Sequence, residues 1–399
     1  MSIRKREWTT PKGEHKAAWL VDYRDAAGVR RAKQFARKKD ADAFETTASW
    51  EVRQGTHTAD SQSITVTKAG DNWLARCRRD DLEQSTLNAY GQHLKLHIVP
   101  YLGAKRLNQL TTPAVEEFRD TLLDTGRSKA MAKRVLGSLA ALIKEAKRVG
   151  YVAHNVASGV TVKRSGREKT PVVPPAKEQM RLIIEAASWK GARPMERPLI
   201  LVLLFAGLRA SEVRGLPWRN VNLSAGAITI DQRADFKNII GPPKSKSGFR
   251  TIRIPALVVT ALKRWKLQCP PSTLGLVFPS EAGTPIFHAN LTTKVIDPLL
   301  ARAGMVRPKF DSAGAAAMDD DGQPLMESQF SLHDFRHACA SMWIEQRVQA
   351  KRVQTWMGHH SIQVTFDTYG HLFAALEEDA AVMAALEAGI MGTNEEAAA

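Results

Sequence analysis

The chain has few of the residues that cross-link small secreted domains or hold metal ions. Among its 399 residues are three cysteines, an odd number placed far apart: Cys77, Cys269 and Cys339. This pattern excludes a disulfide framework and a CxxC metal site, and it predicts reduced packing residues in an intracellular protein. The sequence also lacks a GxxxxGK[ST] phosphate loop and an acidic cluster with two-metal spacing, so we expect neither a metal nor another cofactor.

Long apolar runs are absent as well. The longest, residues 198–208, is too short to cross a bilayer and predicts a buried helix. The charged N-terminus, MSIRKREW, has no apolar stretch behind it, which argues against a signal peptide. We therefore expect a cytoplasmic protein with no membrane role.

Positive charge is the main feature of the composition. The formal net charge is +16 and the sequence pI is about 9.8, which favours a polyanionic partner. The charge is spread over three segments, with net values of +4 for residues 1–60, +9 for 61–170 and +9 for 171–372. Residues 373–399 carry −6. This distribution suits a protein that wraps around its ligand better than one with a single basic tail, although composition alone does not separate nucleic acid from an anionic membrane. The length predicts two or three domains.

The first segment, about residues 1–60, predicts a small sheet backed by one helix. Alternating apolar residues and a turn at 25–28 indicate a hairpin, and a helix follows with Asp40 as its N-cap and Gly55 near its end. Arg31 and Lys33 lie on the second strand. Two interpretations remain open for them: they read a DNA groove, or they form a solvated basic strand face.

The second segment, about residues 61–165, predicts a helical bundle. Between residues 128 and 150, apolar side chains recur at helical spacing: Met131, Val135, Leu139, Leu142, Ile143 and Ala146. Lys133 and Arg134 lie off that apolar stripe, so we expect them on a basic outer face that binds DNA. Three prolines, glycine and basic charge between 163 and 175 predict an interdomain linker.

The third segment, residues 170–390, predicts a mixed α+β domain. Helical patterns at 177–190 and 196–207 precede two strand-like runs, AITIDQ and FRTIRIP, and further helical patterns follow. Residues 391–399 form a tail.

Several residues of this segment have a structural interpretation when each is considered alone. Arg209 and Glu212 form a plausible ion pair, Lys246 is an ordinary hairpin lysine, and His333 with Arg336 is a common HxxR spacing. His359 can cap the helix that ends near Gly358, and Tyr369 can be a packing aromatic.

Considered in order, these residues resemble the tyrosine recombinase (phage integrase) family. That family has an Arg in a GLRxSE-like motif, a Lys in a β-hairpin loop, an HxxR, a GH and a final Tyr. Here the matching residues are Arg209 in GLRASE, Lys246, His333 with Arg336, His359 after Gly358, and Tyr369. The resemblance implies a small β-sheet-plus-helix N-terminal arm-binding domain, an all-α core-binding domain and a mixed α+β catalytic domain.

The resemblance also implies roles for these residues. Tyr369 is the nucleophile that forms a 3′-phosphotyrosine, although an ordinary phenol with a pKa near 10 attacks poorly. Arg209 and Arg336 stabilise the phosphate oxygens, which planar guanidiniums suit better than lysine does. Lys246 is the general acid for the 5′-oxygen, and His333 and His359 handle protons or bind phosphate.

The implied function is site-specific integration or excision of a prophage or other mobile element, without metal or ATP. The implied partners are double-stranded attachment-site DNA, three further copies in a tetramer, and in some systems a directionality factor. Two alternatives stay open: a type IB topoisomerase, and a non-catalytic DNA-binding protein with a degenerate integrase fold.

Three features depart from the family pattern or extend it. Asn220 and Asn222 stand where the family often has an aspartate. Residues 307–330 are longer than expected and suggest a flexible insert or a partner contact. A helical pattern at 373–388 is expected to dock on a neighbouring subunit.

Overall fold

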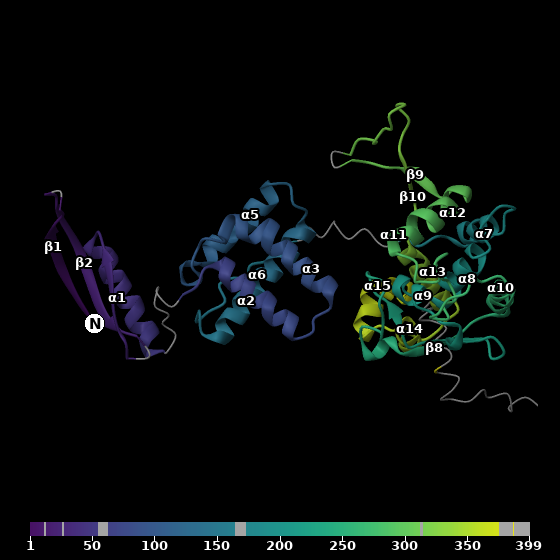
Figure 1. Ribbon diagram of the computed structural model, residues 1–399, viewed down its shortest axis with the longest axis horizontal. Helices are drawn as coiled ribbons and strands as arrows, with labels where there is room; N and C mark the ends of the chain where they lie inside the picture. Colours follow the sequence, from purple (N-terminus) through teal and green to yellow (C-terminus); the bar gives the residue numbers. More distant parts are fainter. Residues whose placement is uncertain are drawn as a thin grey trace, which may run out of the picture. The chain divides into compact units, whose positions relative to one another are not determined.

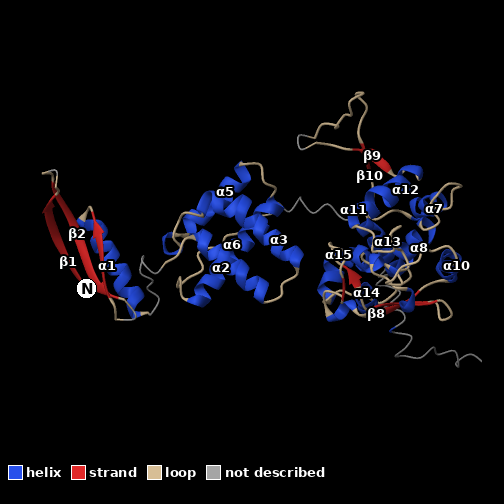
Figure 2. Ribbon diagram, in the orientation of Figure 1, coloured by secondary structure: helices blue, strands red, loops and turns tan. Residues whose placement is uncertain are grey.

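The structure is a computed structural model that describes residues 1–11, 13–25, 28–54, 63–163, 173–311, 314–374 and 386. Contacts within the chain divide it into two compact units, Met1–Lys169 and Thr170–Ala399. Each unit is described separately below (Figures 1 and 2). No helix in the described part of the chain is long and apolar enough to cross a membrane.

The first unit begins with a three-stranded antiparallel sheet. Its strands are β1 (Ser2–Thr9), β2 (His15–Arg24) and β3 (Arg30–Phe35), in the order β1-β2-β3. The predicted hairpin is present as β2 and β3, closed by Asp25, whose carboxylate accepts the Val29 N–H at 2.9 Å. Strand β1 was not predicted, because its charged residues do not alternate with apolar ones.

Helix α1 (Lys38–Arg53) packs on this sheet through the buried residues Ala41 and Ala48. Its N-cap is Arg37, so the prediction that Asp40 caps it was wrong. Asp40 instead lies in the first helical turn, where its charge favours the positive end of the helix dipole. Gly55, predicted near the helix end, lies outside the described residues.

A helical bundle follows in the same unit. Its helices are α2 (Val66–Arg79), α3 (Gln84–His93), α4 (Val99–Leu102), α5 (Thr112–Asp124) and α6 (Lys129–Val149). The predicted stripe on α6 is buried except for the half-buried Met131, and Gly150 ends the helix at φ 88°. The all-helical prediction for this segment is therefore confirmed.

The second unit is built around a buried apolar helix, α8 (Glu196–Ala206). Three helices pack against it: α7 (Lys177–Ala186), α10 (Ala256–Lys266) and α13 (Leu332–Glu345). The unit also contains α9 (Ala210–Arg214), α11 (His288–Leu291), α12 (Asp297–Arg302) and α14 (Ala350–Met357). Helix α15 (Ile362–Ala374) follows and carries Tyr369. Leu199 to Leu203 of α8 are completely buried, as its uninterrupted apolar sequence predicts.

Short strands complete this unit. Strand β5 (Ala227–Ile230) pairs antiparallel with both β4 (Val221–Asn222) and β8 (Arg250–Arg253), and β6 (Arg233–Ala234) pairs with β7 (Ile240–Gly241). The two predicted strand runs are β5 and β8, and the predicted α+β mixture is confirmed.

The insert at 307–330 forms a hairpin arm. Strands β9 (Val306–Pro308) and β10 (Met326–Ser328) pair antiparallel at its base, and isolated bridges continue outward between Phe310 and Ala316 and between Met318 and Pro324. Figure 1 shows the arm projecting from β9 and β10. A partner contact by this arm stays a prediction. The predicted docking helix at 373–388 falls almost entirely outside the described residues.

Candidate active site

Three consecutive residues at the end of α14, Met357 to His359, bring three of the six predicted catalytic residues together. The Met357 carbonyl accepts a hydrogen bond from the Arg336 guanidinium, and the Gly358 carbonyl accepts one from Arg209 at 2.8 Å. The next residue is His359. Residues that lie up to 150 positions apart in the sequence therefore meet at one helix end.

Glycine is required at position 358 for conformational and steric reasons. Gly358 ends α14 in the left-handed region at φ 63°. A Cβ there would lie 2.9 Å from the Ser247 carbonyl oxygen and 3.0 Å from a nitrogen of Arg250. The backbone can therefore turn beside the arginines only if this residue has no side chain.

Arg209 stands at the N-cap of α9, two residues after Gly207, the left-handed C-cap of α8. Glu212 accepts hydrogen bonds from both the backbone N–H and the guanidinium of Arg209, each at 2.8 Å. The Arg209 side chain is 37% exposed, so it is fixed at its base and still accessible to a ligand.

A further arginine, Arg250, binds the same carboxylate. It donates to both oxygens of Glu212 at 3.0 and 2.8 Å, and to the carbonyls of Trp356 at 2.6 Å and Gly248 at 2.9 Å. The side chains of Arg250 and Glu212 are 2% and 3% exposed. Glu212 is thus a buried anion between two arginines, and it connects Arg209 to the start of β8.

Arg336 is almost completely buried on α13. One guanidinium nitrogen donates to the Gly207 carbonyl at 2.6 Å and another donates to Met357. Burial first and the charge of Arg209 second lower the pKa of Arg336 to about 9, which leaves the guanidinium protonated at neutral pH.

Electrostatics at the site favour an anionic ligand. Burial by itself would raise the pKa of Glu212, but hydrogen bonds and charge from Arg250, then the charges of Arg209 and Arg336, lower it to about 2. Two guanidiniums therefore bind one carboxylate, and the third, Arg336, adds its charge nearby. This excess of positive charge suits a phosphodiester, which carries one negative charge.

His359 is held in its neutral form. Its Nδ1 lies 2.9 Å from the hydroxyl of the fully buried Thr365, and the ring is half-buried. Burial and the charges of Arg336, Arg209 and Arg250 lower the pKa of His359 to about 3. His333, at the first turn of α13, also has a lowered pKa, caused by burial and then by Arg336.

Tyr369 is buried, at 3% exposure, and packs against Ala340, Ile344 and Val353. Its hydroxyl lies 2.7 Å from Nδ1 of His337, a residue that the sequence interpretation did not select. Burial raises the pKa of the Tyr369 phenol well above its ordinary value, although the charge of Arg336 opposes this.

Lys246 lies on the short 3₁₀ turn η5 (Lys246–Gly248) between β7 and β8, as the hairpin pattern predicted. The side chain is exposed. The turn is attached to the arginine cluster, because Arg250 donates to the Gly248 carbonyl and the Ser247 carbonyl lies against Gly358. An exposed lysine on an anchored turn can reach a ligand bound over the arginines.

The predicted DNA-binding residues of the first unit have different environments. Lys133 and Arg134 are exposed on α6. Arg31 is half-buried and pairs with Asp25 at 2.9 Å, and the Lys33 amine lies 4.7 Å from the Phe44 ring centroid. These contacts show a structural use for Arg31 and Lys33, and DNA contact by all four residues stays a prediction.

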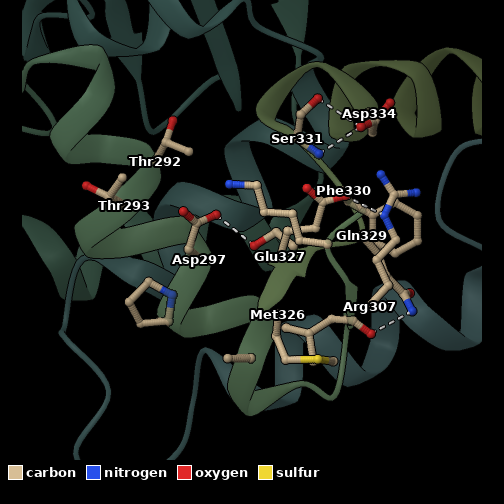
Figure 3. A pocket seen from close by; sticks show the side chains of 15 residues that line it. Thr292, Thr293, Asp297, Arg307, Met326, Glu327, Gln329, Phe330, Ser331 and Asp334 are labelled. Atoms are coloured by element: carbon tan, nitrogen blue, oxygen red, sulfur yellow. Dashed lines mark hydrogen bonds and ion pairs between the residues drawn. The ribbon is translucent and has the colours of Figure 1, made fainter. Parts of the chain in front are cut away.

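A groove of about 700 Å³ lies at the base of the hairpin arm (Figure 3). Within it, Arg307 pairs with Glu327 at 2.9 Å, and Asp297 accepts a hydrogen bond from Ser328 at 2.7 Å. None of the predicted catalytic residues lines this groove. The arginine cluster is therefore the stronger candidate site.

Two residues of the site, Arg250 and His337, were missed from the sequence, and each had a signal. Arg250 and Ile252 of β8, and Ile254 directly after it, alternate with exposed residues, so an arginine stands on the inward face of a strand. His337 follows His333 by four positions, which places both on one face of α13. Their rings lie 4.5 Å apart, edge to face.

Comparison with known proteins gives the same assignment for both units. Residues 176–375 match the model of the phage integrase family, and residues 65–123 match that of the phage integrase N-terminal SAM-like domain. A tyrosine recombinase XerC-like protein of Caldanaerobacter subterraneus is 25% identical over 88% of this chain and 90% of its own length. The ICEBs1 integrase of Bacillus subtilis is 23% identical over 80% and 83%.

Solved structures share the fold. The Tn1549 transposon integrase in complex with transposon right end DNA matches 82% of this chain and 100% of its own, with 17% identity and a TM-score of 0.64. A lambda integrase tetramer bound to a Holliday junction matches 89% and 95%, with 17% identity and a TM-score of 0.53.

Proposed function

This chain belongs to the phage integrase family of tyrosine recombinases, and from that premise we propose that Tyr369 attacks a DNA phosphodiester to form a 3′-phosphotyrosine. The observation that carries the proposal is the meeting of Arg336, Arg209 and His359 at the Met357 and Gly358 carbonyls. Three residues selected from the sequence therefore lie close together, and their positive charge supports the binding of a phosphate.

Arg209 and Arg336 form the phosphate clamp. Each guanidinium has five N–H groups and donates two of them to the protein, so donors remain for the non-bridging oxygens. Glu212 and the backbone carbonyls fix both side chains before DNA arrives. Such preorganised donors stabilise the charge that develops in the transition state, and losing one typically costs roughly 3–4 kcal/mol.

Proton transfer completes the reaction. The bond from the Tyr369 oxygen to phosphorus forms as the bond to the 5′-oxygen breaks, so the phenol must lose a proton and the 5′-oxygen must gain one. Lys246 donates to the leaving oxygen. His333 accepts the phenol proton or binds the phosphate, whereas His359, whose pKa of about 3 makes it too weak a base for that transfer, binds the phosphate as a neutral ring.

The substrate in this proposal is double-stranded DNA with specific attachment sites, cut within an assembled tetramer. The support is the DNA-bound Tn1549 integrase and the lambda integrase tetramer on a Holliday junction, which share this fold. The same reasoning covers integration or excision of a mobile element, with or without a directionality factor. A topoisomerase of type IB would instead relax plasmids that lack any attachment site.

The test of the nucleophile is a suicide-substrate assay. The cleavage site is first mapped on DNA that flanks the gene, and a nicked duplex with that core sequence then traps covalent protein. Tyr369→Phe should bind the duplex with unchanged salt dependence and trap none. Covalent linkage by the phenylalanine variant would refute the proposal.

The test of the general acid uses a changed leaving group. Lys246→Ala should cleave the normal duplex about a hundredfold more slowly, within the usual range for a lost proton donor. A duplex with sulfur in place of the 5′-bridging oxygen needs no proton, so it should restore most of the rate. An equal defect on both substrates would assign Lys246 to binding.

A further inference from the structure

We propose that His337 is a positioning residue that holds Tyr369 in a resting pose through the hydrogen bond between its Nδ1 and the phenol hydroxyl. The inference rests on the proposed function, in which Tyr369 is the nucleophile. His337 has no role in the phosphate clamp or in the proton transfers described above.

The Tyr369 hydroxyl contacts His337 and not the phosphate clamp. Within the described residues, the 2.7 Å bond to His337 is the only hydrogen bond that the Tyr369 hydroxyl makes. The donors of Arg209 and Arg336 that contact protein point instead to Glu212 and to the backbone carbonyls. The nucleophile is therefore attached to a neighbour of the clamp, not to the clamp itself.

The direction of the hydrogen bond follows from burial. Tyr369 is 3% exposed, whereas His337 is half-buried. If Nδ1 carried the proton, the buried phenol proton would have no acceptor, which is costly. If the phenol donates to Nδ1, its proton has an acceptor, and the remaining N–H, on Nε2, lies on the less buried His337 ring. The phenol is therefore the donor.

His337 is a poor base for this phenol. Burial, and then the nearby His333, lower the pKa of His337 to about 4, while burial raises the pKa of Tyr369. An ordinary phenol already has a pKa of about 10, so the pKa values of Tyr369 and His337 differ by more than six units. The proton therefore stays on Tyr369, and the bond holds the hydroxyl without activating it.

The surroundings allow the contact to open. A cavity of about 180 Å³ lies beside the pair, lined by both side chains and by Pro174, Ser341 and Leu372. The His337 ring also contacts His333 edge to face, with 4.5 Å between ring centroids. A phosphate that binds His333 therefore acts on a ring in direct contact with the one that holds the nucleophile.

The experiment compares three full-length proteins on the nicked duplex used above: wild type, His337→Leu and His337→Asn. The leucine variant removes the acceptor and should form covalent complex about two- to tenfold faster, the range of one net hydrogen bond, with unchanged DNA affinity. The asparagine amide lies near the place of Nδ1 and should keep the rate close to wild type. His288→Leu, at an exposed histidine of α11, is the matched control.

A spectroscopic readout reports the bond directly. With five tyrosines in the chain, ¹³C labelling at the phenol carbon gives few signals, and Tyr369→Phe identifies the one of interest. That signal should shift in His337→Leu and much less in His337→Asn. If the leucine variant does not fold, His337→Ala replaces it, and the same faster cleavage and the same shifted signal are expected.

The outcomes separate the two proposals. A leucine variant that cleaves at or below the wild-type rate, while Tyr369→Phe is inactive, refutes the resting pose and leaves the proposed function intact. A Tyr369→Phe protein that still becomes covalently attached refutes the proposed function itself.

Discussion

Replacing Glu212 with glutamine should weaken the second unit more than any exposed charge substitution does. The side chain is 3% exposed and holds Arg209 and the equally buried Arg250. Glutamine has nearly the same shape, so the loss is mainly one of charge. Arg250 would remain buried with no counter-charge, which is among the costliest changes in a protein interior.

Two estimates of the magnitude agree. The pKa of Glu212 lies at about 2 against an ordinary 4.5, and each unit corresponds to 1.36 kcal/mol, so the ionised form contributes about 3 kcal/mol at neutral pH. Breaking a buried ion pair by removing one partner typically costs roughly 3–5 kcal/mol. We therefore expect Glu212→Gln to destabilise this unit by about 3 kcal/mol.

The sign of the pH dependence follows from the same shift. A carboxyl with a lowered folded-state pKa stabilises the protein above pH 4.5, and this contribution is lost as the pH falls from 4.5 to 2. Glu212→Gln should lack that acid-dependent loss, because it has no proton to bind.

The assay is hydrogen exchange across a urea series, followed by mass spectrometry on peptides from α8 and α13 of the full-length chain. The matched control is Glu327→Gln, which removes an exposed partner of Arg307 on the arm and should change stability by under about 1 kcal/mol. Equal unfolding midpoints for the two variants would refute the reasoning about the buried carboxylate.

Three further predictions concern the glycine turn, acid sensitivity and DNA affinity. Gly358→Ala should destabilise the second unit by at least about 1–2 kcal/mol and lower the cleavage rate, because a Cβ adds a clash beside the arginines to the backbone strain at φ 63°. Gly191→Ala, at φ 104° with open space around it, is the control that should show the backbone strain alone in thermal unfolding. With a folded pKa near 3, His359 should contribute stability above pH 6.5 that is lost as the pH falls toward 3, so His359→Asn should flatten the dependence of Tm on pH over that window. A Lys133→Ala, Arg134→Ala double variant should lose the same factor of affinity for attachment-site DNA and for random DNA. In anisotropy titrations, the slope of log binding constant against log salt concentration should fall in magnitude by about two, and an unchanged slope would exclude both side chains from phosphate contact.

Much of the fold could be predicted locally. Helical spacing of apolar residues located α6 and α8, and alternation located β2, β5 and β8, because local patterns depend on residues a few positions apart. Strand β1 and the Arg37 cap of α1 were missed, since their signals are weak in the charged N-terminal sequence. The hairpin arm was missed too, because its ladder pairs residues across a Gly/Ala-rich stretch with no strand pattern.

The sequence by itself determined the identity and order of the residues that we propose as reactive groups: Arg209, Lys246, His333, Arg336, His359 and Tyr369. Only the tertiary structure decided what holds them. The buried ion pair between Glu212 and Arg250 joins residues 38 positions apart, and the bond between Tyr369 and His337 joins residues 32 positions apart. Such contacts depend on how α9, β8, α13 and α15 pack together, and no local pattern specifies the distance between two side chains on different elements.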